Sequence, residues 1–276
     1  MKTRRRLRFL ILPALLVACF GFVPQAAAAQ EGRVHYLRSV QYDFHVPERW
    51  AQMRDRVPAQ STTSMVLLFD GSSSLMKRSA EEEEAGPRRA GARATGGGDR
   101  RALGMMLRLR QQSASRSDQE NLREAYVDFA SGTVTETREF MGRTFLIRGE
   151  RPTYQWRLGS EQREFLGFMV QKATAVHDGS EIEAWFTPEI PVQAGPGEFG
   201  GLPGLILVLS IDAGHRLYSA TEVDLTGLGD DSIAPPEDGD EVSREEYEQI
   251  VAERIEELRT MRAAGNRRRP FDGQFR

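Results

Sequence analysis

The chemistry that the sequence suggests first lies in residues 195–204, called here the Gly/Pro segment. Its first six residues, Gly195-Pro-Gly-Glu-Phe-Gly200, match G-x-G-x-x-G. In that pattern a glycine turn and a helix N-terminus hold the pyrophosphate of a dinucleotide. Here Pro203 and an apolar run, Leu205–Leu209, follow instead of a helix, and the run predicts a buried strand. We therefore expect a structural turn, no bound nucleotide and no cofactor.

Ser74-Leu-Met-Lys77 is a second chemical pattern, because S-x-x-K carries the nucleophile of penicillin-recognising enzymes. The S-D-N and K-T-G partners of that motif are absent from the sequence. Ser74 is therefore interpreted as a residue of the turn that begins at Gly71. We assign no catalytic residue.

The histidines are scattered and form neither an H-E-x-x-H motif nor an i, i+4 pair. They are His35, His45, His177 and His215. We interpret them as exposed or loop residues and assign no metal site. The alternative is an enzyme or metal-binding protein whose site is assembled in three dimensions around one hairpin. Its candidate residues are His177, Glu181, Glu183 and Glu189.

Aromatic residues surround the Gly/Pro segment in the sequence. Such rings commonly pack in cores, and that interpretation stands beside a functional one, in which an apolar groove lets a ligand approach bare glycine backbone. In either case we expect Gly201 or Gly204 to adopt a positive φ or to lie against a neighbouring backbone or an aromatic ring, with Trp185 the preferred ring. The candidate ligand-binding residues are Trp156, Trp185, Phe199, Gly201, Pro203 and Gly204.

Residues 1–29 have the pattern of an export signal. A basic start precedes the apolar stretch Phe9–Val23, and Ala26–Ala29 provide small residues for cleavage. Leu16-Val-Ala-Cys19 also fits a lipoprotein cleavage box, which would place the protein on a membrane through a lipid on Cys19. We favour cleavage near Ala29 and expect a periplasmic or envelope-associated protein. Its mature chain then has no cysteine and no disulfide.

The charge of the expected mature chain argues against nucleic acid as a partner. Loss of the five basic residues in 1–29 turns 37 basic against 40 acidic residues into 32 against 40, a net charge of −8. Nucleic-acid binding needs a basic surface that neutralises phosphates. The expected partner is therefore an apolar ligand or another envelope protein.

Short runs of alternating apolar and polar residues predict an antiparallel β domain over residues 30–228. A charged low-complexity stretch at 77–117 interrupts it and predicts a disordered insertion. An acidic linker (229–242), a helix (243–264) and a loose tail (265–276) follow. Strands are expected at 34–46, 64–70, 125–129, 133–140, 143–148, 154–158, 165–177, 181–187, 205–211 and 216–225.

The predicted C-terminal helix opens with a capping box, Ser243-Arg-Glu-Glu246. One face of it carries an apolar stripe, which predicts packing against the sheet, with docking to a partner as the alternative. The stripe consists of Tyr247, Ile250, Val251, Ile255, Leu258 and Met261. The fold class is therefore mainly β: a curved antiparallel sheet or half-barrel with a C-terminal amphipathic helix.

Gly201-Leu-Pro-Gly-Leu-Ile206 spells the signature of the GLPGLI family of exported proteins, and the chain resembles that family from about residue 125 to residue 262. Ala184-Trp-Phe-Thr187 and Glu189-Ile-Pro191 resemble its approach to the signature. Met169 departs from the pattern, because many relatives carry a cysteine there. The resemblance implies export and a β architecture and carries over no activity.

From these observations we expect a non-catalytic exported envelope protein that binds an apolar ligand, a peptide or a partner protein. The expectation rests on the missing catalytic motifs and on the aromatic residues around the Gly/Pro segment. A periplasmic enzyme or metal-binding protein that uses His177 and nearby carboxylates is the alternative.

Overall fold

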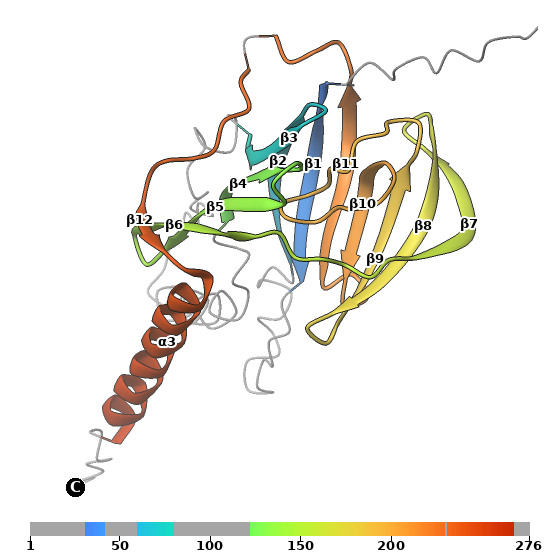
Figure 1. Cartoon of the computed structure of the whole chain (residues 1–276). Coiled ribbons are helices and arrows are strands. Elements are labelled where there is room, and N and C mark those ends of the chain that lie inside the picture. The colour runs from blue at the N-terminus through green and yellow to red at the C-terminus, as the bar shows by residue number, and fades with distance from the viewer. Residues whose placement is uncertain (1–30, 42–59, 80–121, 230, 268–276) are drawn as a thin grey trace, which may run out of the picture.

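A computed structural model describes residues 31–41, 60–79, 122–229 and 231–267. It confirms a mainly β fold: one curved, open sheet that does not close into a barrel, with a helix at the C-terminal end (Figure 1). The predicted export signal, residues 80–117 of the predicted insertion and residues 268–276 of the tail lie outside the described residues. Within the described part, no helix is long and apolar enough to cross a membrane.

The sheet has twelve strands in the described residues, and eleven of them pair antiparallel with their neighbours. Their order across the sheet is β12-β6-β5-β4-β3-β2-β1-β11-β10-β9-β8-β7. The strands are β1 (Gly32–Gln41), β2 (Gln60–Phe69), β3 (Ser73–Arg78), β4 (Leu122–Asp128), β5 (Thr133–Phe140), β6 (Arg143–Glu150), β7 (Arg157–Phe165), β8 (Phe168–His177), β9 (Ser180–Thr187), β10 (Leu205–Ile211), β11 (Arg216–Asp224) and β12 (Asp240–Val242).

Three two-residue turns set the register of three of the hairpins. In Met141-Gly142, Leu166-Gly167 and Asp178-Gly179 both residues have positive φ, the geometry that matches the twist of paired strands. Only Asp178-Gly179 was predicted, because Asp-Gly is a common pair for this turn. Leu166 adopts a φ of 52°, which is rare for leucine, so the sequence did not indicate a turn there. The predicted single strand at 165–177 is therefore wrong, because Phe165 ends β7 and Phe168 begins β8 of a hairpin.

Two boundary predictions around β3 were wrong. The turn after β2 covers only residues 70–72, because the Asp70 carboxylate accepts hydrogen bonds from the Ser72 and Ser73 amides, both at 2.7 Å. Ser74 therefore lies inside β3 and not in the turn. Lys77 and Arg78, assigned to the insertion, also belong to β3 and pair with β2.

The predicted linker also contributes a strand. Asp240–Val242 form β12, which pairs parallel with β6 at one edge of the sheet. The pairing gives the outer backbone groups of β6 hydrogen-bond partners. The chain therefore covers the middle of this edge, residues 145–147, with its own strand.

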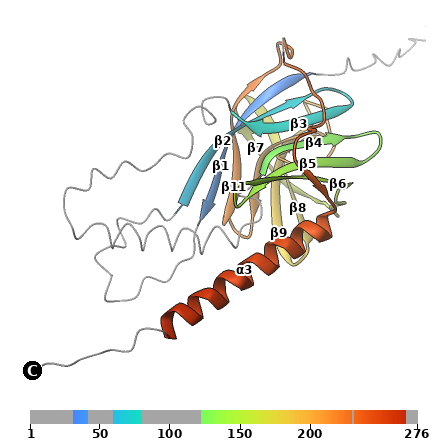
Figure 2. The same cartoon turned by 90° about the vertical axis from the view of Figure 1, so that its left-hand side faces the viewer.

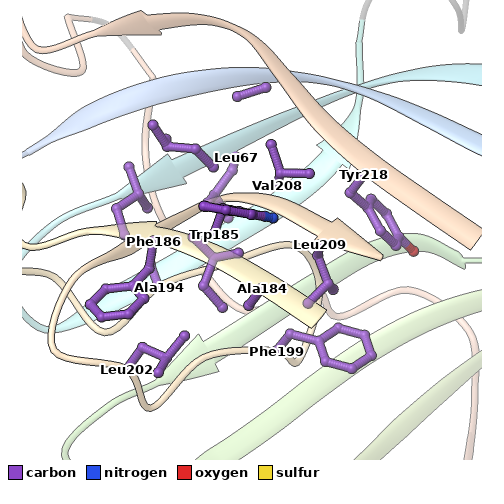
Figure 3. Packing of buried hydrophobic residues seen from close by; sticks show 14 of the residues in the cluster. Leu67, Ala184, Trp185, Phe186, Ala194, Phe199, Leu202, Val208, Leu209 and Tyr218 are labelled. Carbon is purple, nitrogen blue, oxygen red and sulfur yellow. The ribbon is translucent and has the colours of Figure 1, made fainter. Parts of the chain in front are cut away.

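The inside of the curve is filled by residues 188–204, called here the crossing loop. At one end the amide nitrogens of Leu205 and Ile206 donate to its carbonyl groups; at the other, the Gly197 amide lies 2.9 Å from the Met76 sulfur of β3. Strands β10 and β3 are separated in the sheet by β11, β1 and β2, so only the concave side lets one loop reach both. Figure 3 shows its side chains packed with those of the strands. Its buried apolar residues are Ile190, Val192, Ala194, Phe199 and Leu202.

The helix α3 (Arg244–Arg267) begins as predicted and packs against the sheet only near its start. The capping box is present, since Ser243 Oγ accepts from the Glu246 amide at 3.1 Å and Glu246 accepts from the Ser243 amide at 2.8 Å. Tyr247 is 1% exposed and meets the Phe145 ring of β6 edge-on at 5.4 Å. The rest of the helix projects away from the sheet (Figures 1 and 2).

Candidate binding site

The Gly/Pro segment forms the second half of the crossing loop and is held by an arginine from the end of β6. Arg151 donates from Nε to the Glu198 carbonyl at 2.9 Å and from Nη2 to the Gln193 carbonyl at 3.0 Å. A Cβ at Gly200 would lie 1.8 Å from that Nη2. Glycine at 200 therefore gives the guanidinium room to join both halves of the loop.

Two of the predicted ligand-binding aromatics meet beside this loop. Phe199 stacks on Tyr154, with 5.1 Å between ring centroids, and Trp156 lies 5.6 Å from Tyr154 on another side. The Trp156 indole nitrogen donates to the Gly200 carbonyl at 2.8 Å. Phe199 is 5% exposed and Trp156 is partly buried. These rings hold the loop in place from one side.

The predicted glycines have different surroundings. Gly201 and Pro203 are exposed at the turn of the loop, and Gly201 has a φ of +81° with open space where a Cβ would be. Gly204 is buried, and a Cβ there would lie 2.1 Å from the Thr187 carbonyl oxygen. Backbone atoms of Thr187 and Pro188, and not the Trp185 ring, fill the space beside Gly204.

Trp185 lies apart from the other predicted residues because it is on the opposite face of the sheet. Side chains alternate along β9, so Ala184 and Phe186 face the crossing loop, whereas Trp185 lies on the other face, where it is still only 8% exposed. Its indole nitrogen donates to Glu183 at 2.9 Å, and the Arg163 guanidinium lies 3.9 Å from the ring centroid. The six predicted residues therefore do not line one groove.

The hypothesised site around His177 is not assembled. By the same alternation His177 lies on the inner face, next to Tyr154 at 5.0 Å between rings, while Glu181 and Glu183 lie on the outer face. Glu183 pairs with Lys172 at 3.0 Å, and Glu189 accepts from the Met169 amide at 2.8 Å. No group of three or more metal-ligating side chains forms among the described residues.

A buried charge cluster joins the crossing loop, β5 and α3, and sequence reasoning did not predict it. Glu136 and Arg138 are each 1% exposed, and Arg138 Nη2 donates to Glu136 Oε2 at 2.8 Å. Arg244 bridges that same Glu136 oxygen at 3.3 Å and Glu198 Oε2 at 3.1 Å. Two carboxylates and two guanidiniums thus neutralise each other where three elements meet. Glutamate and arginine in a strand are usually exposed to solvent. Their burial here becomes evident only when the residues that they contact in the folded chain are known.

Burial raises the pKa of Glu198 above its ordinary value of 4.5, and the nearby Glu136 carboxylate raises it further. The contribution of Glu198 to stability is therefore full below pH 4.5 and is lost as pH rises through the raised native pKa. Glu198→Gln removes this dependence. We expect the free energy of unfolding of the variant, relative to wild type, to increase with pH above 4.5 in urea titrations. A difference that does not change with pH would contradict this placement of Glu198.

The other edge of the sheet is formed by β7, which pairs only with β8 in the described residues. In a two-residue hairpin the flanking pair, here Phe165 and Phe168, exchanges hydrogen bonds, and the next bonded pair is Arg163 with Val170. Gln162 and Glu164 belong to the alternate pairs, so their N–H and C=O groups point away from β8. This outer row of backbone groups is called here the free edge.

The free edge is accessible. Of the nine residues of β7, seven are exposed, and only Gly159 and Phe165 are partly buried. The ladder between β7 and β8 is interrupted between Leu158 and Gln162, where the register shifts. Sequence reasoning missed this edge because it placed strands at 154–158 and 165–177 and left most of β7 unassigned.

The chain is similar to one protein family in sequence and to one solved protein in fold. Residues 175–208, from the end of β8 through β9 and the crossing loop into β10, match a family described as a protein of unknown function, Porph_ging. No curated protein matches the chain in sequence.

Two solved crystal forms of PNGF-II are similar in structure, each 14% identical and matched over 81% of this chain. The TM-score is 0.50 for the C2 form and 0.49 for the P21 form. The chain spans 33% of the PNGF-II chain in both. At this identity the likeness to the C2 form concerns the fold alone.

Proposed function

We propose that the chain is an exported, envelope-associated protein without catalytic activity that binds an extended segment of a partner protein along β7. The observation that carries the proposal is the free edge, a nine-residue strand that, among the described residues, has a neighbouring strand on one side only. Strand addition uses such an edge: backbone hydrogen bonds supply affinity, and alternate side chains supply specificity.

The two edges of the sheet differ in a way that supports this choice. The edge of β6 is covered by β12, whereas β7 has no such cover among the described residues. Its exposed side chains include Arg157, Glu161 and Glu164, and charges of this kind discourage unspecific pairing. They favour a polar partner segment with charges of both signs.

The crossing loop argues against the other binding mode that the sequence suggested, an apolar ligand inside the curve. Phe199 and Leu202 of this loop already occupy that space and are 5% and 1% exposed. A ligand there would have to displace buried side chains and the hydrogen bonds of Arg151. Binding at the free edge requires no displacement of buried side chains of β7, since seven of its nine residues are exposed.

The family and the compartment are part of the same proposal. We place the chain in the GLPGLI family, because the matched span 175–208 contains the Gly201–Ile206 signature. Export follows from the pattern of residues 1–29 and from that family resemblance. The alternative is a periplasmic enzyme or metal-binding protein built on His177. The carboxylate near His177 on the inner face is Glu198, and this group already accepts a hydrogen bond from Arg244.

Gln162→Pro tests the free edge directly. Proline removes the N–H that points away from β8 and is tolerated at strand edges, so we expect the fold to remain. Ten-residue peptides selected by display on the wild-type protein should bind the variant at least tenfold more weakly, a loss of about 1.4 kcal/mol. The measurement is peptide affinity by calorimetry, with thermal unfolding as the check on folding.

Two control variants separate the edge from general damage. Gln162→Thr keeps the N–H and should bind like wild type, whereas Arg163→Pro breaks a bond to β8 and should lower the unfolding temperature. Selected peptides that bind Gln162→Pro with wild-type affinity would contradict the proposal. Peptides that lose affinity when Trp156 is replaced, and not when Gln162 is, would also contradict it.

A further inference from the structure

The part of α3 that projects beyond the sheet has an apolar face, and the packing of the fold does not account for that face. The helix has 24 residues and is about 36 Å long at 1.5 Å per residue. The apolar residues of α3 that pack against the buried cluster on β6 are Tyr247, Ile250 and Val251. Figure 2 shows the remaining turns extending away from the sheet. A helix of this length gains little stability alone in water and usually depends on an apolar face packed against a partner.

The apolar stripe continues beyond the sheet. Ile255, Leu258 and Met261 follow Val251 at spacings of four, three and three residues, which keeps them on one face. Ile255 and Leu258 are half-buried within their own helix, and Met261 is 63% exposed. This face continues the one that packs on β6.

The charges along the helix change sign near Leu258. Residues 244–257 contain six glutamates and two arginines, and Arg254 is bonded to Glu257 at 2.5 Å. The sequence from 259 to 267 contains three arginines and no acidic residue. Two such helices that run antiparallel bring the acidic half of each beside the basic half of the other. A parallel pair would place the acidic halves together and both sheets at the same end.

We propose that α3 is a dimerisation helix, which pairs antiparallel with α3 of a second copy of this chain, with Leu258 at the centre of the contact. In this register Ile255 of each copy meets Met261 of the other, and the sheets lie at opposite ends. The acidic half disfavours the other occupant of an amphipathic helix, an anionic membrane surface. The surface is separate from the free edge of β7, so the two proposals stand or fall independently.

Light scattering after size exclusion tests the proposal at protein concentrations from 5 to about 100 µM, the range in which moderate dimers form. Wild type should dimerise, and Leu258→Asp should raise the dissociation constant at least tenfold with no change in the unfolding of the sheet. The matched control is Thr260→Asp, an exposed residue off the stripe, which should still dimerise.

A variant with reversed charges in the acidic half of α3 tests the antiparallel arrangement. Changing Glu253, Glu256 and Glu257 to arginine should weaken self-association. Replacing half of the wild-type protein by this variant, at the same total concentration, should leave fewer dimers than wild type alone. A wild-type monomer at about 100 µM overturns the proposal. So does a dimer that survives Leu258→Asp, and so does one that is lost in Gln162→Pro, which would place the contact at β7. Binding of the monomer to phosphatidylglycerol vesicles through Leu258 would assign the helix to membranes instead.

Discussion

Gly204→Val is expected to lower the free energy of unfolding by about 3 kcal/mol, the upper end of the usual cost of overpacking. A Cβ at this position would lie 2.1 Å from the Thr187 carbonyl oxygen and 2.6 Å from its carbon. These are backbone atoms of β9, so they cannot move aside as a flexible side chain would. The cost should appear in urea unfolding as a lower midpoint with an unchanged slope.

Gly201→Ala is the matched control for this prediction. Gly201 has a φ of +81° and open space around the missing Cβ, so alanine should cost only the backbone strain, about 1 kcal/mol. If Gly204→Val kept wild-type stability but lost peptide binding, the Gly/Pro segment would be a binding loop and the account of a structural crossing loop would be wrong.

Glu136→Gln is expected to cost about 3 kcal/mol or more, because it removes a buried negative charge that pairs with both Arg138 and Arg244. Arg138 is 1% exposed, and its guanidinium donates to the Glu136 carboxylate at 2.8 and 3.1 Å. Arg244 would also lose one of its two carboxylates. The measurement is equilibrium unfolding at pH 7.

The exposed pair Arg143–Asp240 provides the comparison. Its atoms lie 2.7 Å apart, but the side chains are 62% and 59% exposed, so Asp240→Asn should cost less than about 1 kcal/mol. Equal costs for Glu136→Gln and Asp240→Asn would show that the cluster is hydrated in solution. The double replacement of Glu136 and Arg138 by apolar residues should recover much of the lost stability.

The parts of the fold that the sequence predicted are those governed by local patterns. Alternation identified β5, and an unbroken apolar run identified β10, both with their observed limits. Asp178-Gly179 identified one hairpin, and Ser243–Glu246 identified the start of α3. Each of these signals lies within a few neighbouring residues. Leu205 begins the apolar run that predicted a buried strand, and it is 0% exposed.

The parts that the sequence did not predict depend on contacts between distant segments. Glu136 and Glu198 are 62 residues apart and meet only because the crossing loop spans the concave face. Trp185 was grouped with Phe199 by proximity in sequence, but strand alternation places it on the other face of the sheet. The free edge of β7 was missed because a rare positive φ at Leu166 concealed the hairpin.

Residue-resolved amide hydrogen exchange, with and without a selected peptide, tests most directly the central claim that partners bind β7 and not the inside of the curve. The amides of Leu205 and Ile206 donate to the crossing loop and should exchange slowly in both states. The amides of Gln162 and Glu164 should exchange fast alone and become protected when peptide is added. Protection that instead appears across 188–204, with no change at Gln162 and Glu164, would contradict the account.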